Sequence, residues 1–148
     1  MKIWNQSSKD NDSSIDYFLS SEDIVLDQEL FLYDIQASIA HAHELQAINI
    51  LTKTETKKII ASLKKLANLF QTKKFKLTSK YEDCHSAIEQ YLTKELGSVG
   101  KKIHTGRSRN DQVMVAMRLF AMAKLDDIQS INLKNSSIIS RESRKAFV

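Results

Sequence analysis

Residues 104–112 read HTGRSRNDQ, and residues 113–128 continue with VMVAMRLFAMAKLDDI. In the second stretch, apolar side chains recur at steps of three and four residues, which is the period of one face of an α-helix. This face consists of Val113, Met117, Phe120 or Ala121, Leu125 and Ile128. The spacing predicts a long helix that begins near Asn110 or Asp111, directly after a dense polar cluster. We interpret the methionines at 114, 117 and 122 as core filler.

Two more helices are predicted at the start of the chain. The first begins near Leu26, has a face of regularly spaced apolar residues, and stops near Asn49. The second follows Thr52 and Glu55, which have the spacing of a capping box, in which each side chain bonds the other residue's backbone amide. The buried face of the second helix is predicted to contain Ile59, Leu63, Leu66 and Phe70.

A third upstream helix is expected between a second capping-box pattern at residues 79–82 and Gly97, because glycine favours helix C-termini. Residues 98–109 are predicted to form a loop. Proline is absent and there are only three glycines, so few residues interrupt helices. The sequence therefore predicts an all-α fold with short polar connections.

The net charge of +4 does not by itself indicate a nucleic-acid partner. Four basic residues and one acidic residue lie in the last eighteen positions, so the other 130 residues carry only +1. A local basic run remains, and it supports an alternative function as a non-enzymatic basic helical interaction module, for instance for nucleic acid. The run consists of Lys64, Lys65, Lys73, Lys74 and Lys76.

Cysteine usage and apolar patterning bound the location of the protein. Cys84 is the only cysteine, so no intramolecular disulfide is possible, which suits a reducing compartment. The first residues lack the apolar core of a signal peptide, and no apolar stretch is long enough to span a bilayer. We expect a soluble cytoplasmic protein without a membrane partner.

The polar cluster at residues 104–112 has the composition of an anion site. Arg107 and Arg109 offer forked donors that match carboxylate or phosphate groups. Free backbone amides and the dipole of the following helix favour an anion at the same place, and Gly106 permits a close approach. The alternative is an ordinary polar loop in which Asn110 caps the helix and the arginines are solvated.

A second polar cluster contains Glu82, Asp83, His85 and Glu89. His85 and Glu89 are four residues apart and could pair on a helix, while the first two carboxylates suit a helix N-terminus. The two-histidine metal motif would need a second histidine four residues on, which is missing, so no metal site is predicted. We expect structural support instead, with Asp83 holding an arginine of the 104–112 loop.

At this point the sequence resembles the argininosuccinate lyases. Residues 100–103 (GKKI) followed by HTGRSRNDQ resemble the signature loop of that family. Residues 33–42 (YDIQASIAHA), residues 82–89 (EDCHSAIE) and Leu51-Thr52 resemble other family segments in the same order. The likeness covers roughly residues 1–129, and the loop string argues against a related lyase that acts on adenylosuccinate.

The resemblance implies a helical homotetramer of the fumarase/aspartase superfamily. It implies cleavage of argininosuccinate into arginine and fumarate by proton abstraction and loss of the guanidino group, without a metal or organic cofactor. The residues implied in substrate binding are Asn110, Arg109, Thr105, Ser108 and Ser21, and those implied in support are Asp83, His85, Arg107 and Asp111.

The sequence also departs from the family. Trp4 is followed by Asn5, where the family has a Trp-Gly-Gly-Arg-Phe-like stretch, and the spacing from Ser21 to Asp27 differs from the family pattern. The family's catalytic histidine and serine lie in His-Leu-Gln-like and Gly-Ser-Ser motifs, and neither motif occurs in these 148 residues. No catalytic residue is therefore expected in this chain, and we predict that it is inactive alone.

The expected organisation has four parts. Residues 1–16 form a polar N-terminal segment, residues 17–109 an N-terminal helical lyase domain, and residues 110–129 the start of a helix of the superfamily's central bundle. After Gln129 the helical period fades, and residues 130–148 form an atypical tail with five serines. This tail is either a frayed natural end or a foreign sequence from a frameshift or a misplaced gene boundary, and we favour the second hypothesis.

Overall fold

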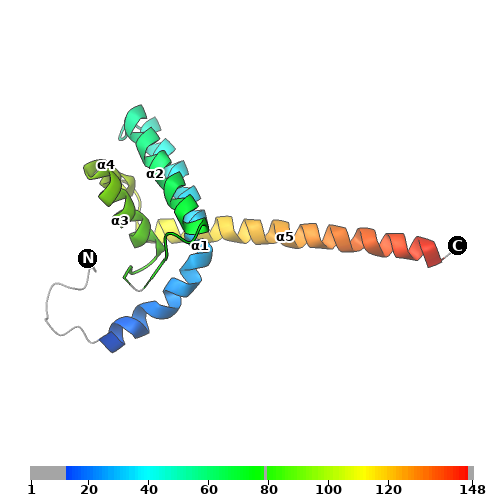
Figure 1. The fold of residues 1–148 in the computed structure, drawn as a ribbon. Coiled ribbons are helices and arrows are strands. Elements are labelled where there is room, and N and C mark those ends of the chain that lie inside the picture. Colours follow the sequence, from blue (N-terminus) through cyan, green and yellow to red (C-terminus); the bar gives the residue numbers. More distant parts are fainter. Residues whose placement is uncertain (1–12, 79, 147–148) are drawn as a thin grey trace.

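The computed structural model describes the backbone of residues 13–78 and 80–146, and the side chains of residues 27–78 and 80–138. Its elements are α1 (Ser13–Ala47), α2 (Lys53–Gln71), α3 (Cys84–Leu96), α4 (Ser98–Lys101), the 3₁₀ helix η1 (Lys102–His104) and α5 (Arg109–Ala146). No strand occurs in the described part of the chain, so the predicted all-α fold is confirmed. The helices α1 to α4 pack together, the first turns of α5 pack against α1, and the rest of α5 extends away from them (Figure 1).

Local chemistry explains where the upstream helices end. Asn49 has a φ of 62° and ends the turn after α1, a left-handed conformation that asparagine tolerates. The predicted capping box is confirmed, since the Thr52 side chain accepts from the Glu55 amide and the Glu55 side chain accepts from the Thr52 amide. Gly97 ends α3 as predicted, with a φ of 61° that favours glycine.

The hydrophobic core lies where α1, α2 and α3 meet. Phe31 is fully buried and its ring lies 4.4 Å from that of Phe70 and 5.6 Å from that of Phe75. Aromatic packing of this kind joins the middle of α1 to the end of α2. Other fully buried side chains of this core are Leu45, Leu51, Ile59, Leu63, Leu66 and Leu92.

Three predicted boundaries need correction. α1 begins at Ser13, well before Leu26, because no proline or glycine interrupts that stretch. It therefore includes the last residues of the polar N-terminal segment predicted at 1–16. Asp83 caps α3 through the Ser86 amide at 2.7 Å, so the expected start of this helix at residues 79–82 is wrong; Ser79 itself lies outside the described residues. Residues 98–104 form α4 and η1 rather than loop, because the chain reverses at Gly97 and starts a new helical turn.

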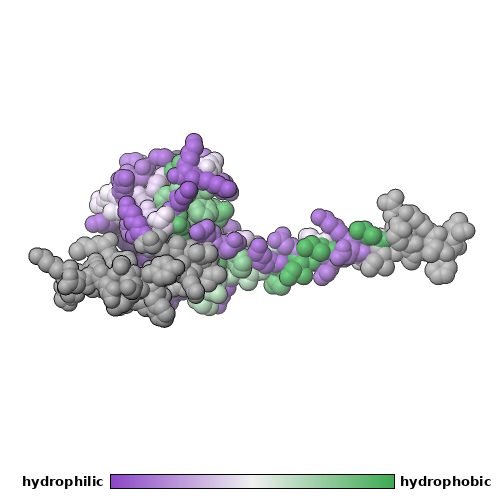
Figure 2. Space-filling view, turned by 60° about the horizontal axis from the view of Figure 1, so that its bottom comes forward, coloured by the Kyte–Doolittle hydropathy of each residue, from purple (hydrophilic) through white to green (hydrophobic). Residues whose placement is uncertain are grey.

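The long helix α5 differs most from expectation. It continues to Ala146, so the predicted loss of helix after Gln129 is wrong. Lysine and leucine lose little on helix formation, and serine and asparagine cost less than about 1 kcal/mol each, so the helix can continue where the apolar period is absent. The methionines at 114, 117 and 122 are 51%, 50% and 62% exposed, so they are not core filler in this chain. Apolar residues therefore lie on the surface of the projecting rod, between polar ones (Figure 2).

Candidate anion site at the start of the long helix

The loop between η1 and α5 is shaped by Gly106 and closed by Ser108. Gly106 has a φ of 75°, and a side chain there would be strained although the space around it is open. The Ser108 amide donates to Asp111 Oδ2 at 2.7 Å, and the Asp111 amide donates back to Ser108 Oγ at 3.4 Å. Ser108 is therefore the cap of α5, and the expectation that Asn110 caps this helix is wrong.

Arg109 anchors the first turn of α5 to the start of α3. Its guanidinium lies 3.0 Å from Glu82 Oε1 and 3.0 Å from Asp83 Oδ2, and it donates to Ser86 Oγ at 3.3 Å. The hydrogen bond to Glu82 raises the pKa of Arg109, with the charge of Asp83 acting in the same direction. Asp83 thus holds an arginine of this loop, as predicted, and Arg109 is that arginine.

Arg107 points the other way, into the space between α1 and α5. Its Nη2 donates to Ser38 Oγ at 3.0 Å, and the amide oxygen of Gln112 accepts from Nη2 and Nε at 2.9 and 3.0 Å when it faces the guanidinium. Burial lowers the pKa of Arg107, and the charge of Asp34 opposes that shift. The two arginines thus hold the loop from opposite sides, one on α3 and one on α1.

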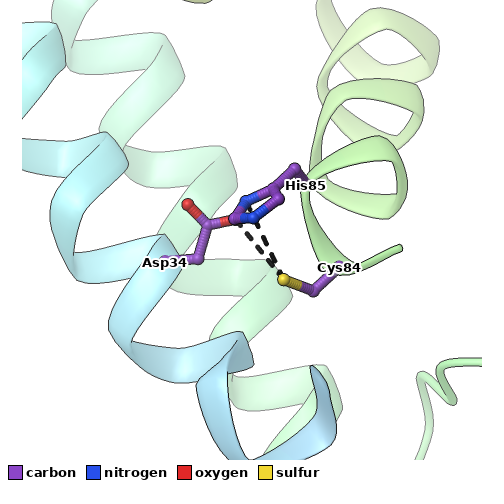
Figure 3. A group of neighbouring side chains, drawn as sticks. All are labelled: Asp34, Cys84 and His85. Atoms are coloured by element: carbon purple, nitrogen blue, oxygen red, sulfur yellow. Dashed lines mark hydrogen bonds and ion pairs between the residues drawn. The ribbon is translucent and has the colours of Figure 1, made fainter. Parts of the chain in front are cut away.

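A buried polar centre lies beneath this loop. His85 Nδ1 and Asp34 Oδ2 are 2.6 Å apart, and both side chains are almost fully buried between α3 and α1 (Figure 3). Burial alone would lower the pKa of His85, but the hydrogen bond and charge of Asp34, with smaller contributions from Asp83 and Asp27, raise it. His85 is therefore paired with Asp34 across two helices, in surroundings that favour its protonated form, and the suggested pair with Glu89 is wrong.

Glu89 instead faces His104 at the end of η1. Glu89 Oε2 lies 3.2 Å from His104 Nε2, which is within ion-pair distance but not aligned as a hydrogen bond. Burial lowers the pKa of His104, the charge of Glu89 raises it, and that of Arg107 lowers it again, with a net lowering. Nearby, His41 Nε2 lies 3.0 Å from the carbonyl oxygen of Thr105 and ties this loop to α1.

Three possible metal-ligand atoms lie close together around His85, but their contacts are those of a hydrogen-bonded group. Asp34, Cys84 and His85 each place one possible ligand atom within 4.8 Å of the others. A structural zinc site needs four ligands, and the described residues supply three. The shortest separation, 2.6 Å between Asp34 and His85, is that of a hydrogen bond. Burial, followed by the charge of Asp34, raises the pKa of the Cys84 thiol, which favours the neutral form.

The residues implied in substrate binding do not all have free side chains. Thr105 and Asn110 are exposed, and neither side chain makes a hydrogen bond to another described residue. Ser108 and Arg109 are engaged by Asp111 and by the α3 carboxylates, as given above. Ser21 belongs to α1, but its side chain lies outside the described part of the chain. The loop therefore presents two free polar groups on a framework held by its other members.

Sequence reasoning missed three residues that build this framework. Asp34, Ser38 and His41 lie on one side of α1 at intervals of four and three residues, and they contact His85, Arg107 and the Thr105 carbonyl. The available signal was polar residues repeating at helical spacing within an apolar helix, which indicates a buried polar stripe.

Comparison with known proteins finds similarity to lyases over most of the chain. A family model described as "Lyase" matches residues 7–146. An argininosuccinate lyase of Xylella fastidiosa strain Temecula1 is 47% identical over 130 residues, covering 88% of this chain and 29% of that protein. That of Xanthomonas campestris pv. campestris strain B100 is 46% identical over 136 residues, covering 92% of this chain and 32% of that protein.

The chain thus spans about a third of the length of the relatives it matches. The matched range includes residues 130–146, so it extends into the segment described as an atypical tail, whose origin stays a prediction. In the described part of the chain, no helix is both long and apolar enough to cross a membrane. On the strength of the family match over residues 7–146, the chain belongs to the lyase family, and its similar relatives are argininosuccinate lyases.

Proposed function

We propose that this chain is the N-terminal part of an argininosuccinate lyase and supplies the loop that holds a carboxylate of the substrate. The observation that carries the proposal is the pairing of two free donors, on Thr105 and Asn110, with the N-terminus of a long helix. Unpaired amides and the helix dipole favour an anion there. The reaction would release fumarate and arginine, with no metal or organic cofactor.

The rest of the loop acts as a support. Arg107 and Arg109 are engaged on α1 and α3, so we assign them to positioning the loop and to its local positive potential. Hydrogen bonds with Asp111 hold Ser108 in place, and the pair of His85 and Asp34 joins α3 to α1 beneath the loop. A carboxylate-binding group must be held within about half an ångström to help catalysis, which is what such a support provides.

The chemical step belongs to segments that this chain does not contain. Proton abstraction needs a base within hydrogen-bond reach of the substrate carbon, and expulsion of the guanidino group needs an acid. Neither a His-Leu-Gln nor a Gly-Ser-Ser motif is present. We expect the 148-residue chain to bind the dicarboxylate weakly and to produce no fumarate from argininosuccinate.

Binding and turnover are tested separately. Fumarate is titrated into the chain while amide and side-chain NMR signals of residues 105–112 are followed, and fumarate release from argininosuccinate is followed by absorbance. Asn110→Ala is expected to weaken binding about tenfold, the effect of one lost hydrogen bond to a charged group. Asn132→Ala, in an exposed part of α5, is the control and should bind normally. Unchanged binding by Asn110→Ala, or turnover by the chain alone, would contradict the proposal.

The homotetramer implied by the family is part of the same proposal. α5 exposes large apolar side chains on one side over several turns, among them Met114, Met117, Leu125 and Ile128. An apolar stripe of this kind on a single helix marks a contact with other helices. In the whole enzyme we expect it to be buried between subunits.

A further inference from the structure

A separate hollow opens beside α3. It has a volume of about 760 Å³, and its wall includes Tyr81 and Glu82 before α3, Ser86 and Gln90 on α3, and Arg109 at the start of α5. Sites for small molecules commonly have volumes of roughly 300–1,000 Å³. Thr105 and Asn110, the free groups of the substrate loop, do not line it. The hollow is therefore large enough for a ligand and distinct from the proposed carboxylate site.

The charges around the hollow leave a surplus of unpaired ammonium groups. Lys80, Lys94 and Lys101 line it, and none has a carboxylate within 4.0 Å among residues 27–78 and 80–138. The carboxylates of the same wall each have a cation or a histidine nearby. Glu95 meets Lys65 at 2.9 Å, and Glu89 meets His104 at 3.2 Å.

Three aromatic side chains form the apolar part of the wall. The ring of Phe75 lies 5.8 Å from that of Tyr81 and 6.2 Å from that of Tyr91. The three residues are partly buried, so the cluster is packed but not closed off. All three rings also pack against the core, and the parts of them that line the hollow can bind a planar ring by stacking or edge contacts. Lysines beside such faces offer compact point charges that suit phosphate.

We propose that this hollow binds a planar aromatic compound carrying a phosphate group, and that its occupancy is coupled to the substrate loop through Arg109. The guanidinium of Arg109 lines the hollow while its backbone begins α5, next to Asn110. A phosphate in the hollow would compete with Glu82 for that guanidinium and so change the anchoring of the loop. Only the coupling rests on the proposed function, because binding in the hollow stands on its own residues.

The test uses adenosine 5′-monophosphate as the probe and the 148-residue chain at low salt. Calorimetric titration should give saturable binding, with NMR shifts at Tyr81, Gln90 and Arg109. Replacing the three lysines together by alanine should weaken binding about tenfold or more, since each exposed ion pair contributes a few-fold at low salt. The matched control replaces Lys57, Lys58 and Lys64 by alanine, which are exposed on α2 and do not line the hollow.

Each other outcome overturns the proposal. Equal weakening in the control triple would mean non-specific attraction to a basic surface, and inorganic phosphate binding as tightly as the nucleotide would remove the role of the aromatic wall. Absence of saturation up to millimolar probe would remove the site. Coupling requires that the probe change the affinity for fumarate, and that fumarate change the affinity for the probe by the same factor. Asn110→Ala should weaken fumarate binding but leave binding of the probe unchanged, so failure of the lyase proposal is seen separately.

Discussion

The buried pair of Asp34 and His85, which lies beneath the loop, allows a quantitative prediction of how its loss changes the stability of the chain. Asp34→Asn keeps the shape of the side chain but removes its charge, so the pair loses a charge-assisted hydrogen bond of 2.6 Å. Such bonds contribute about 1.5–3 kcal/mol to stability. The larger cost of stranding a buried charge does not apply, because His85 can release its proton. With a urea slope of about 2 kcal/mol/M, the unfolding midpoint should fall by roughly 1 M.

The pH dependence of this loss follows from the pKa of His85. The pKa is raised in the folded chain, so the pair contributes its full stability below the unfolded pKa of about 6.5. That contribution is lost as the pH rises through the folded pKa. Burial lowers the pKa of His85, and the charge of Asp34 opposes that effect. In Asp34→Asn this charge is gone, so the pKa of His85 should fall. The stability difference between the two proteins should therefore be larger at pH 6 than at pH 8.5.

Urea unfolding followed by circular dichroism at both pH values measures this difference. Asp126→Asn, an exposed carboxylate on α5, is the control and should shift the midpoint little at either pH. A difference for Asp34→Asn that is the same at pH 6 and pH 8.5, or larger at pH 8.5, would refute the raised pKa of His85. An NMR titration of His85 in the folded chain gives the same answer directly.

Three further outcomes test the framework. Gly100→Ala should destabilise the chain by roughly 1–3 kcal/mol in urea unfolding, since its Cβ would overlap the backbone carbonyl of Leu92. Lys102→Met should raise the pKa of Glu55, which the hydrogen bonds from Lys102 and then Thr52 hold at about 2, part of the way to its usual value in a carboxyl-detected NMR titration. Thr52→Ala should lower the unfolding free energy by about 1 kcal/mol, the usual effect of losing a helix N-cap.

The parts of the fold that the sequence predicts correctly depend on nearby residues. Thr52 and Glu55 are three positions apart and make their capping box within one helical turn. Gly97 follows the last apolar residue of α3 and ends the helix by its own conformational freedom. Residues 79–82 have the same spacing as the first box, yet α3 begins only at Cys84, where Asp83 accepts from the Ser86 amide three positions on. Local pattern alone cannot rank two adjacent caps.

The support of the candidate site could not be read from local pattern. Asp34 and His85 are 51 residues apart, and Arg109 lies 27 residues after Glu82. These contacts depend on how α1, α3 and α5 are placed together. The sequence identified the loop by composition and expected Asp83 to hold an arginine, but it left open which arginine.

The long helix shows why periodicity is an incomplete guide to helix length. Apolar spacing reports burial on one face, and it fades after Gln129, where every side chain through Ile138 is exposed. Helix formation itself requires only residues that tolerate the backbone, and no proline or glycine occurs from residue 107 onward. A stretch with this composition extends the helix without a core to pack against. Most helical stability comes from tertiary packing, so a projecting helix that exposes Leu125 and Ile128 fits a contact with helices outside this chain.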